Sequence, residues 1–239
     1  MHHRATSALL ALAALGATTL FAQAPTASAP PNILSAEELA QGFRLLFDGS
    51  STNGWRGYRK PSMDTGWGVR DGNLTVIGRA GDIVTVDQYT NFDLRLQWKV
   101  PEGGNSGVMF HVGEGYDYCW LTGPEMSILD DERHPDGRSR LTSAGSAHSV
   151  YAPPSGVVRP ANQWNDAELI VRGNHVEHWL NGVKVVEYEL HSADWQQRVQ
   201  ASKWAQWPSY ASLSTGYIAL QGDHGPGVQF RSIRIKVLP

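Results

Sequence analysis

The sequence predicts an all-β fold, a sandwich or jelly roll of antiparallel sheets with one or two short helices. Three observations support this. Apolar and polar residues alternate with period 2 along many short segments. Turn residues separate these segments at intervals of about 8 to 12 residues, as in β-sandwiches. The 239 residues also include 25 glycines and 9 tryptophans but only 18% charged residues. Frequent turns and a large aromatic content favour one large β domain.

Charge and cysteine content exclude several classes of protein. The chain has 20 Lys+Arg against 23 Asp+Glu, a formal net charge of -3. This balance offers no basic surplus to neutralise phosphates, so we expect no nucleic-acid partner. The single cysteine, Cys119, excludes an internal disulfide and a four-cysteine zinc site. We expect Cys119 to be buried as a small apolar side chain.

The first residues are typical of an export signal. A short basic stretch precedes an apolar run over residues 8–22, so residues 1–22 are predicted to be a signal peptide. The protein is then exported to the periplasm or the extracellular space, with no membrane association after cleavage. An uncleaved membrane anchor is the alternative. Residues 23–34, rich in Pro, Ala and Ser, are expected to be a linker, and residues 35–239 the β-sandwich domain.

The elements follow in order along the domain. Ser35-Ala-Glu-Glu is a capping box that predicts a short helix to about Gly42. Ser192 is typical of the N-cap of a second helix, over residues 192–203. Gly173-Asn174 and Asn181-Gly182 have the composition of hairpin turns. The predicted strands span residues 67–70, 73–77, 83–86, 92–100, 106–112, 125–130, 167–172, 175–180, 183–190, 217–221 and 228–237.

An ordered set of short motifs runs through the whole folded part. They include Phe47-Asp48-Gly49, Asn105-Ser106-Gly107, Gly123-Pro124-Glu125, Val176-Glu177-His178-Trp179-Leu180-Asn181-Gly182, Asp223-His224-Gly225 and Phe230-Arg231. In this order they resemble the 3-keto-disaccharide hydrolase domain family. The resemblance implies a concanavalin A-like jelly-roll sandwich of two curved antiparallel sheets, with a concave carbohydrate face. It also implies cleavage of glycosides already oxidised at C3.

Three local departures from the family pattern leave the substrate open. Ser127 stands where relatives often carry Gln, His148 stands where relatives usually carry Tyr, and Ser232 stands where relatives end Phe-Arg with Asn.

The implied reaction needs particular chemical groups. A 3-keto group acidifies the C2 proton, so a base can form an enolate that expels the C1 oxygen. This route needs a general base, a group that stabilises the enolate and an acid for the leaving oxygen. Glu125, which begins a mostly apolar strand, is the first acid/base candidate, and His224, on a turn between the last two strands, is the second. Lys203 is the candidate cation near the enolate oxygen.

His111 completes the catalytic candidates. If Val108, Phe110 and Val112 face the core, strand alternation turns His111 toward the concave sheet. His178, which shares its face with Val176, is instead expected to be buried and hydrogen-bonded. For each catalytic candidate the alternative is a purely structural or solvated side chain.

Ten further residues are candidates for sugar binding. Indole rings pack on the C–H faces of sugars, and loop side chains can bind hydroxyl groups. These candidates are Asn105, Trp120, Asp130, Asp131, His134, His148, Trp204, Trp207, Gln221 and Arg231. Asp130 and Asp131 could instead be solvated or bind calcium, and Arg231 could be structural. No spacing is typical of a metal site, so no cofactor is expected, with calcium left open.

The sequence therefore favours an exported enzyme that acts on a glycoside or oligosaccharide with a 3-keto group. A non-catalytic, lectin-like module is the alternative, because sandwiches serve either purpose. A conventional glycoside hydrolase is less favoured, because Glu125 and Asp130 lie five residues apart and face opposite sides of a regular strand. The oligomeric state is not indicated.

Overall fold

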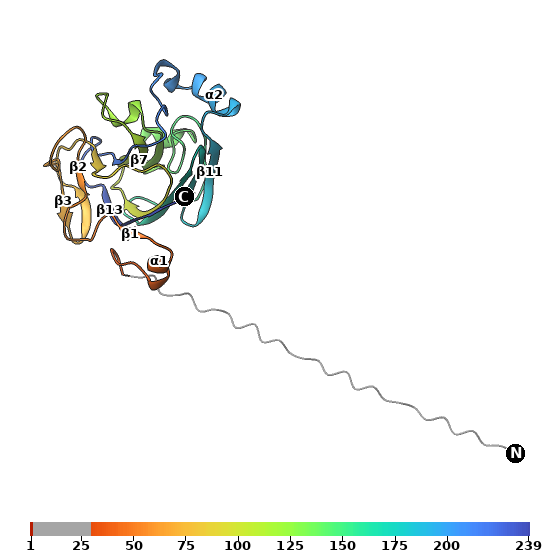
Figure 1. Ribbon diagram of the computed structural model, residues 1–239, viewed down its shortest axis with the longest axis horizontal. Helices are drawn as coiled ribbons and strands as arrows, with labels where there is room; N and C mark the ends of the chain where they lie inside the picture. Colours follow the sequence, from red (N-terminus) through yellow and green to blue (C-terminus); the bar gives the residue numbers. More distant parts are fainter. Residues whose placement is uncertain (2–29) are drawn as a thin grey trace.

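Two antiparallel sheets pack face to face in the computed structural model, which describes Met1 and residues 30–239 (Figure 1). The larger sheet contains β1 (Arg44–Leu45), β3 (Trp67–Arg70), β4 (Asn73–Val76), β6 (Phe92–Lys99), β9 (Asn165–Arg172), β10 (His175–Leu180), β11 (Val183–Glu189) and β13 (Gln229–Val237). Their order is β11-β10-β9-β6-β13-β4-β3, and β1 pairs with β13. The predicted jelly-roll sandwich is confirmed.

The smaller sheet supplies the other layer. It contains β2 (Trp55–Gly57), β5 (Ile83–Thr85), β7 (Asn105–Val112), β8 (Glu125–Leu129) and β12 (Tyr217–Leu220). Their order is β2-β5-β12-β7-β8, which makes β8 an edge strand. The chain covers this edge, because Ala147 forms bridges with both Met126 and Tyr151. A covered edge cannot pair with another chain.

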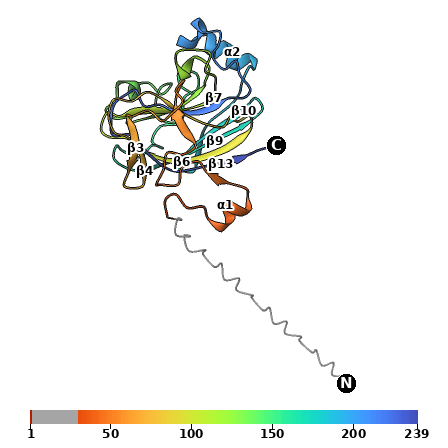
Figure 2. The same ribbon diagram turned by 60° about the vertical axis from the view of Figure 1, so that its left-hand side comes forward.

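The helices are short, as predicted. α1 (Ala36–Ala40) begins at a capping box formed by Ser35 and Glu38, and α2 (Ala193–Gln200) begins at the N-cap Ser192. Three 3-10 turns lie in the loops: η1 (Cys119–Leu121), η2 (Pro135–Arg138) and η3 (Lys203–Gln206). Figure 2 shows α1 on the side of β13 and α2 beyond β7, on opposite faces of the sandwich. No helix among the described residues is long and apolar enough to cross a membrane.

Every predicted strand is present, with ends that differ by no more than two residues. The two strands that the sequence did not predict, β1 and β2, have 2 and 3 residues. Segments this short show too little alternation to stand out.

The core lies between the two sheets. Phe92 on β6 and Phe110 on β7 are fully buried and meet edge to face at 6.4 Å between ring centroids. Each such side chain contributes about 1.5–3 kcal/mol on burial. Cys119 is buried, as predicted. His178 is also buried, as predicted, and bonds through Nδ1 to the Gly145 carbonyl at 3.1 Å.

The segment before α1 is hydrogen-bonded to the larger sheet. The predicted signal peptide falls outside the described residues apart from Met1, and so does the expected linker up to residue 29. Asn32, which was expected to lie in that linker, donates through Nδ2 to the Gly72 carbonyl at 2.8 Å. Its Oδ1 accepts from the Ser232 amide at 2.7 Å, which ties this segment to β13.

Candidate active site

A cavity of 350 Å³ opens on the outer face of the smaller sheet, away from the core between the sheets. Its floor comes from β7, β8 and the residue that follows β12, and its walls come from the loops that contain η1, η2 and η3. It is lined by Asn105, Trp120, Glu125, Asp136, His148, Lys203, Trp204, Gln206, Trp207, Gln221, Asp223 and His224. Most of the candidates from the sequence therefore meet in one place.

Three of these residues were not predicted: Asp136, Gln206 and Asp223. Asp223 precedes His224, and Gln206 lies between Trp204 and Trp207. Proximity to other candidates was the only available signal for them. Asp136 lies in η2, where the His134 side chain caps its backbone amide at 3.2 Å.

Glu125 occupies the floor of the cavity at the start of β8. It lies opposite Met109 of β7, and its side chain extends over Gly107. A Cβ at residue 107 would stand 2.5 Å from the Glu125 Oε1, so only glycine leaves room for this carboxyl group. Glu125 is 6% exposed, and burial raises the pKa of its carboxyl group to about 8, against the opposing effect of the Lys203 charge.

His148 connects Lys203 to the floor of the cavity. Its Nε2 lies 2.8 Å from the Lys203 Nζ, and its Nδ1 lies 2.9 Å from the Ser127 Oγ. Burial, assisted by the Lys203 charge, lowers the pKa of His148 to about 4, so the imidazole is neutral at pH 7. A neutral ring that accepts from the Lys203 ammonium at Nε2 carries its proton on Nδ1 and donates it to Ser127.

Ser127 and His148 each have a further neighbour. The Ser146 hydroxyl donates to the Ser127 Oγ at 3.1 Å, and the His148 Nδ1 lies 3.9 Å from the Glu125 Oε1. Ser127 and His148 are thus direct partners.

Indole rings form one wall. Trp120 lies 6.1 Å from Trp204 and 5.6 Å from Trp207 between ring centroids. The Trp204 Nε1 donates to the His148 carbonyl at 2.7 Å, and the Lys203 ammonium lies 4.6 Å from the centre of the Trp204 ring. The same indole therefore positions both members of the Lys203–His148 pair.

A column of stacked aromatic rings anchors this wall to the rest of the fold. Trp204 stacks on Tyr210 at 4.4 Å, and Tyr210 stacks on Trp195 of α2 at 5.9 Å. Trp195 in turn stacks on Tyr188 of β11 at 5.2 Å. Each aromatic pair adds about 0.5–1.5 kcal/mol beyond its burial. The column keeps the segment that carries Lys203 in a defined position over the sheet.

His224 lies at the mouth of the cavity, on the turn between β12 and β13. Its imidazole is half-exposed, and its Nε2 lies 3.5 Å from the Asp223 Oδ1. At the start of β7, the Asn105 Nδ2 lies 3.4 Å from the His134 Nε2. His134 therefore supports a residue that lines the cavity but does not line it itself.

The structure contradicts the expected position of His111. A bulge interrupts β7 here: the register with β12 shifts, and His111 has a φ of 51°. This reverses the alternation, and the ring packs edge to face on Phe110 and Phe92 in the core. His111 is 2% exposed and bonds through Nε2 to the Thr90 carbonyl at 2.8 Å. It does not reach the cavity.

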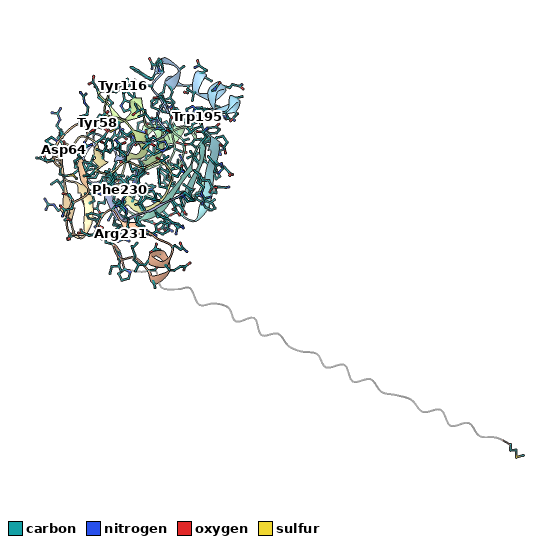
Figure 3. The ribbon with its side chains drawn as sticks, in the orientation of Figure 1. Tyr58, Asp64, Tyr116, Trp195, Phe230 and Arg231 are labelled. Carbon is teal, nitrogen blue, oxygen red and sulfur yellow. The ribbon has the colours of Figure 1, made fainter. Side chains whose placement is uncertain are left out.

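Asp130, Asp131 and Arg231 are also absent from the cavity. Asp130 accepts from the Gly103 amide at 2.8 Å, and Asp131 from the Ala144 amide at 2.8 Å, so both carboxylates hold loop backbone in place. Arg231 lies on the larger sheet, where it donates to the Gln97 Oε1 at 2.8 Å and stacks over the Trp164 ring. Figure 3 shows Arg231 near the end of the molecule that carries α1, far from Trp195 and α2.

One group of side chains among the described residues has the spacing of metal ligands. His175, Glu177 and Glu187 offer ligand atoms within 4.8 Å of one another. They lie on the β10–β11 hairpin of the larger sheet, so this group is separate from the cavity.

Comparison with known proteins gives this geometry a family context. The sequence pattern described as the 3-keto-alpha-glucoside-1,2-lyase-like domain matches residues 42–236, most of the chain. The chain belongs to this family.

Members and relatives of known structure agree with the assignment. A protein of Bacteroides thetaiotaomicron named 3-keto-disaccharide hydrolase is 33% identical over 231 residues, covering 83% of this chain and 79% of the relative. A crystal structure from Parabacteroides distasonis, provisionally described as a glycosyl hydrolase, matches with a TM-score of 0.82 and 36% identity. That match covers 88% of this chain and all of the other. A second P. distasonis structure with the same description has a TM-score of 0.64 and 25% identity, over 82% of this chain and 99% of the other.

Proposed function

We propose that this protein cleaves the glycosidic bond of 3-keto-glycosides by removing the C2 proton and eliminating the C1 oxygen. Family membership and the relative named 3-keto-disaccharide hydrolase support a carbohydrate-cleaving activity. The observation that carries the proposal is Glu125, a buried carboxyl group with a pKa raised to about 8 on the floor of the cavity. A general base works best when its pKa is near the working pH.

The proposed reaction is an elimination followed by addition of water. The Glu125 carboxylate takes the proton from C2, and the electron pair of that bond delocalises onto the C3 oxygen as an enolate. The enolate collapses to form a C1–C2 double bond while the C1–O bond breaks, and the leaving oxygen takes a proton. Addition of water across the new double bond, with OH at C1 and H at C2, completes a net hydrolysis to the 3-keto sugar.

Other residues of the cavity have matching roles in this proposal. Lys203, held between His148 and Trp204, supplies positive charge for the enolate oxygen. The neutral His148 keeps the ammonium group in place. His224 at the mouth of the cavity, beside Asp223, is the acid for the leaving oxygen. The apolar run over residues 8–22 supports export, so the substrate would be met outside the cytoplasm.

The direct test compares two substrates that differ only at C3. The purified protein is incubated with a methyl 3-keto-glucoside and with the unoxidised methyl glucoside, and release of methanol is followed. We expect cleavage of the keto sugar only, because without the carbonyl the C2 proton is not acidic. Transient ultraviolet absorption of the conjugated enone intermediate would identify elimination.

Two results would contradict the proposal. Cleavage of the unoxidised glucoside at a similar rate would indicate conventional glycoside hydrolysis by two carboxyl groups. Binding of both sugars without cleavage of either would indicate a lectin-like module.

A further inference from the structure

A second cavity of 250 Å³ lies directly beside the candidate active site. It is lined by Tyr58, Lys60, Gly81, Asp82, Asp117, Tyr118 and Asp223. Asp223 lines both cavities. The Tyr118 ring stacks on the Trp120 ring at 5.2 Å and 12°, with Tyr118 in the second cavity and Trp120 in the first. One aromatic pair and one aspartate therefore form the boundary between the two spaces.

The lining of the second cavity suits a sugar ring. Tyr118 is 55% exposed although it stacks on Trp120, so much of its surface is available for the C–H face of a sugar. Asp82 is held in place, because its Oδ1 accepts from the Gly222 amide at 3.1 Å. Carboxylates accept hydrogen bonds from sugar hydroxyl groups, and both Asp82 and Asp223 line this cavity.

The charges around the second cavity indicate which sugars would bind. Its two cationic neighbours are already paired: Lys60 with Asp64, and Arg59 with Asp117. The remaining carboxylates, on Asp82 and Asp223, disfavour an anionic ligand. An uncharged sugar is therefore the ligand that fits. The second cavity, at 250 Å³, is smaller than the first, at 350 Å³.

We propose that the second cavity binds the second sugar of the substrate, so that an uncharged 3-keto-disaccharide spans both cavities across the Tyr118–Trp120 pair. This rests on the proposed function, which places the 3-keto ring next to Glu125. The leaving oxygen then lies close to Asp223 and His224, at the boundary between the two rings. The enzyme would favour disaccharides over glycosides with a small aglycone.

Binding rather than turnover tests this proposal. Affinities of a 3-keto-disaccharide and of methyl 3-keto-glucoside are measured by calorimetry in a Glu125→Gln background, with and without Tyr118→Ala. We expect the disaccharide to bind about 10-fold more tightly, a difference of about 1.4 kcal/mol, because it gains stacking on an aromatic side chain. Tyr118→Ala should remove most of that preference and leave the affinity for the methyl glycoside unchanged.

Two variants make the test specific. Tyr118→Phe keeps the ring and should keep the preference. Tyr116→Ala removes a nearby tyrosine (Figure 3) of similar exposure, 45%, and should change neither affinity, because Tyr116 is not among the residues that line the two cavities. Equal affinities for both ligands, an equal loss for both in Tyr118→Ala, or no binding of either would overturn the proposal. Failure of the proposed function gives a different result: no cleavage of any 3-keto-glycoside by the unmodified protein.

Discussion

Glu125 shows how the position of one residue changes its chemistry. In water its carboxyl group would ionise near pH 4.5, but on the floor of the cavity burial raises its pKa to about 8. The fold provides this buried position. Gly107 leaves room for the side chain and the His148 ring lies 3.9 Å away, whereas the positive charge of Lys203 opposes the rise in pKa.

Replacing Glu125 tests its role as the base. We expect Glu125→Gln to lower kcat/KM on a 3-keto-glycoside by about 10²-fold or more, because the amide cannot take a proton. In the unmodified protein kcat/KM should rise with pH and be half-maximal near pH 8, since only the ionised carboxyl group is active. Initial rates from pH 5 to 9 give both results.

Glu102→Gln is the matched control, because this exposed glutamate pairs with Arg133 at the surface. Its rates should equal those of the unmodified protein. A rate of the unmodified protein that falls from pH 6 to pH 8 would contradict the role of Glu125 as the base and leave both Glu125 and His224 open as the acid. Glu125 would be that acid if the fall were absent in Glu125→Gln and present in His224→Gln.

At the scale of elements, two adjacent strands carry the floor of the site, and an aromatic column holds its wall. β7 and β8 pair from Asn105 with Leu129 to Met109 with Glu125, and this register places Gly107 opposite Ser127. The column from Trp204 through Tyr210 to Trp195 attaches η3 to α2. Floor and wall come from distant parts of the chain, so the site exists only when both are docked.

The register of β7 and β8 makes Gly107 a sensitive position. Gly107→Ala should displace the Glu125 carboxyl group, because the added Cβ would stand 2.5 Å from its Oε1. We expect kcat/KM to fall by at least about 10-fold, since small displacements of a catalytic group are costly, while far-ultraviolet circular dichroism stays unchanged.

Gly115→Ala serves as its control. A Cβ at residue 115 meets nothing within 4 Å, so activity should be preserved. Full activity of Gly107→Ala would show that Glu125 does not need its present position.

At the scale of the whole molecule, the sandwich carries a site that lowers the stability of the protein. The larger sheet and the core supply most of the buried apolar surface, whereas the outer face of the smaller sheet holds a buried carboxyl group. Between the unfolded pKa of 4.5 and the folded pKa of about 8, the folded state binds more protons at Glu125 than the unfolded state does. Stability therefore falls as pH rises through this window.

This linkage predicts a variant that is more stable but inactive. The Tm of Glu125→Gln should exceed that of the unmodified protein by more at pH 8 than at pH 6.5. Each kcal/mol of difference in the free energy of unfolding corresponds to about 2–4 °C in Tm. His148, whose pKa is lowered to about 4, stays neutral over this range and does not contribute. Calorimetric scans at both pH values measure the difference. A Tm difference that stays constant with pH would show that Glu125 is not buried as described.

Strand patterns predicted the sheets well and the site partly. Alternation located β6, β7, β9, β10 and β13, because each has one face in the core. The same rule failed at His111, where a bulge turned the side chain from the outer face to the core. It could not assign Asp130 and Asp131 either, because both bond to backbone amides of other loops.

The sequence by itself determined the sandwich, the short helices, the buried Cys119 and the family, because these depend on periodicity, capping residues and ordered motifs along the chain. Only the tertiary structure decided which polar residues share a cavity. Lys203 contacts His148, which is 55 residues away in the sequence. Asn105 lines the same cavity as Gln221 and His224, which come from a much later part of the chain. Which residues line the cavity depends on the register of the strands, on a bulge and on the docking of an aromatic column. Local sequence patterns do not reveal these features.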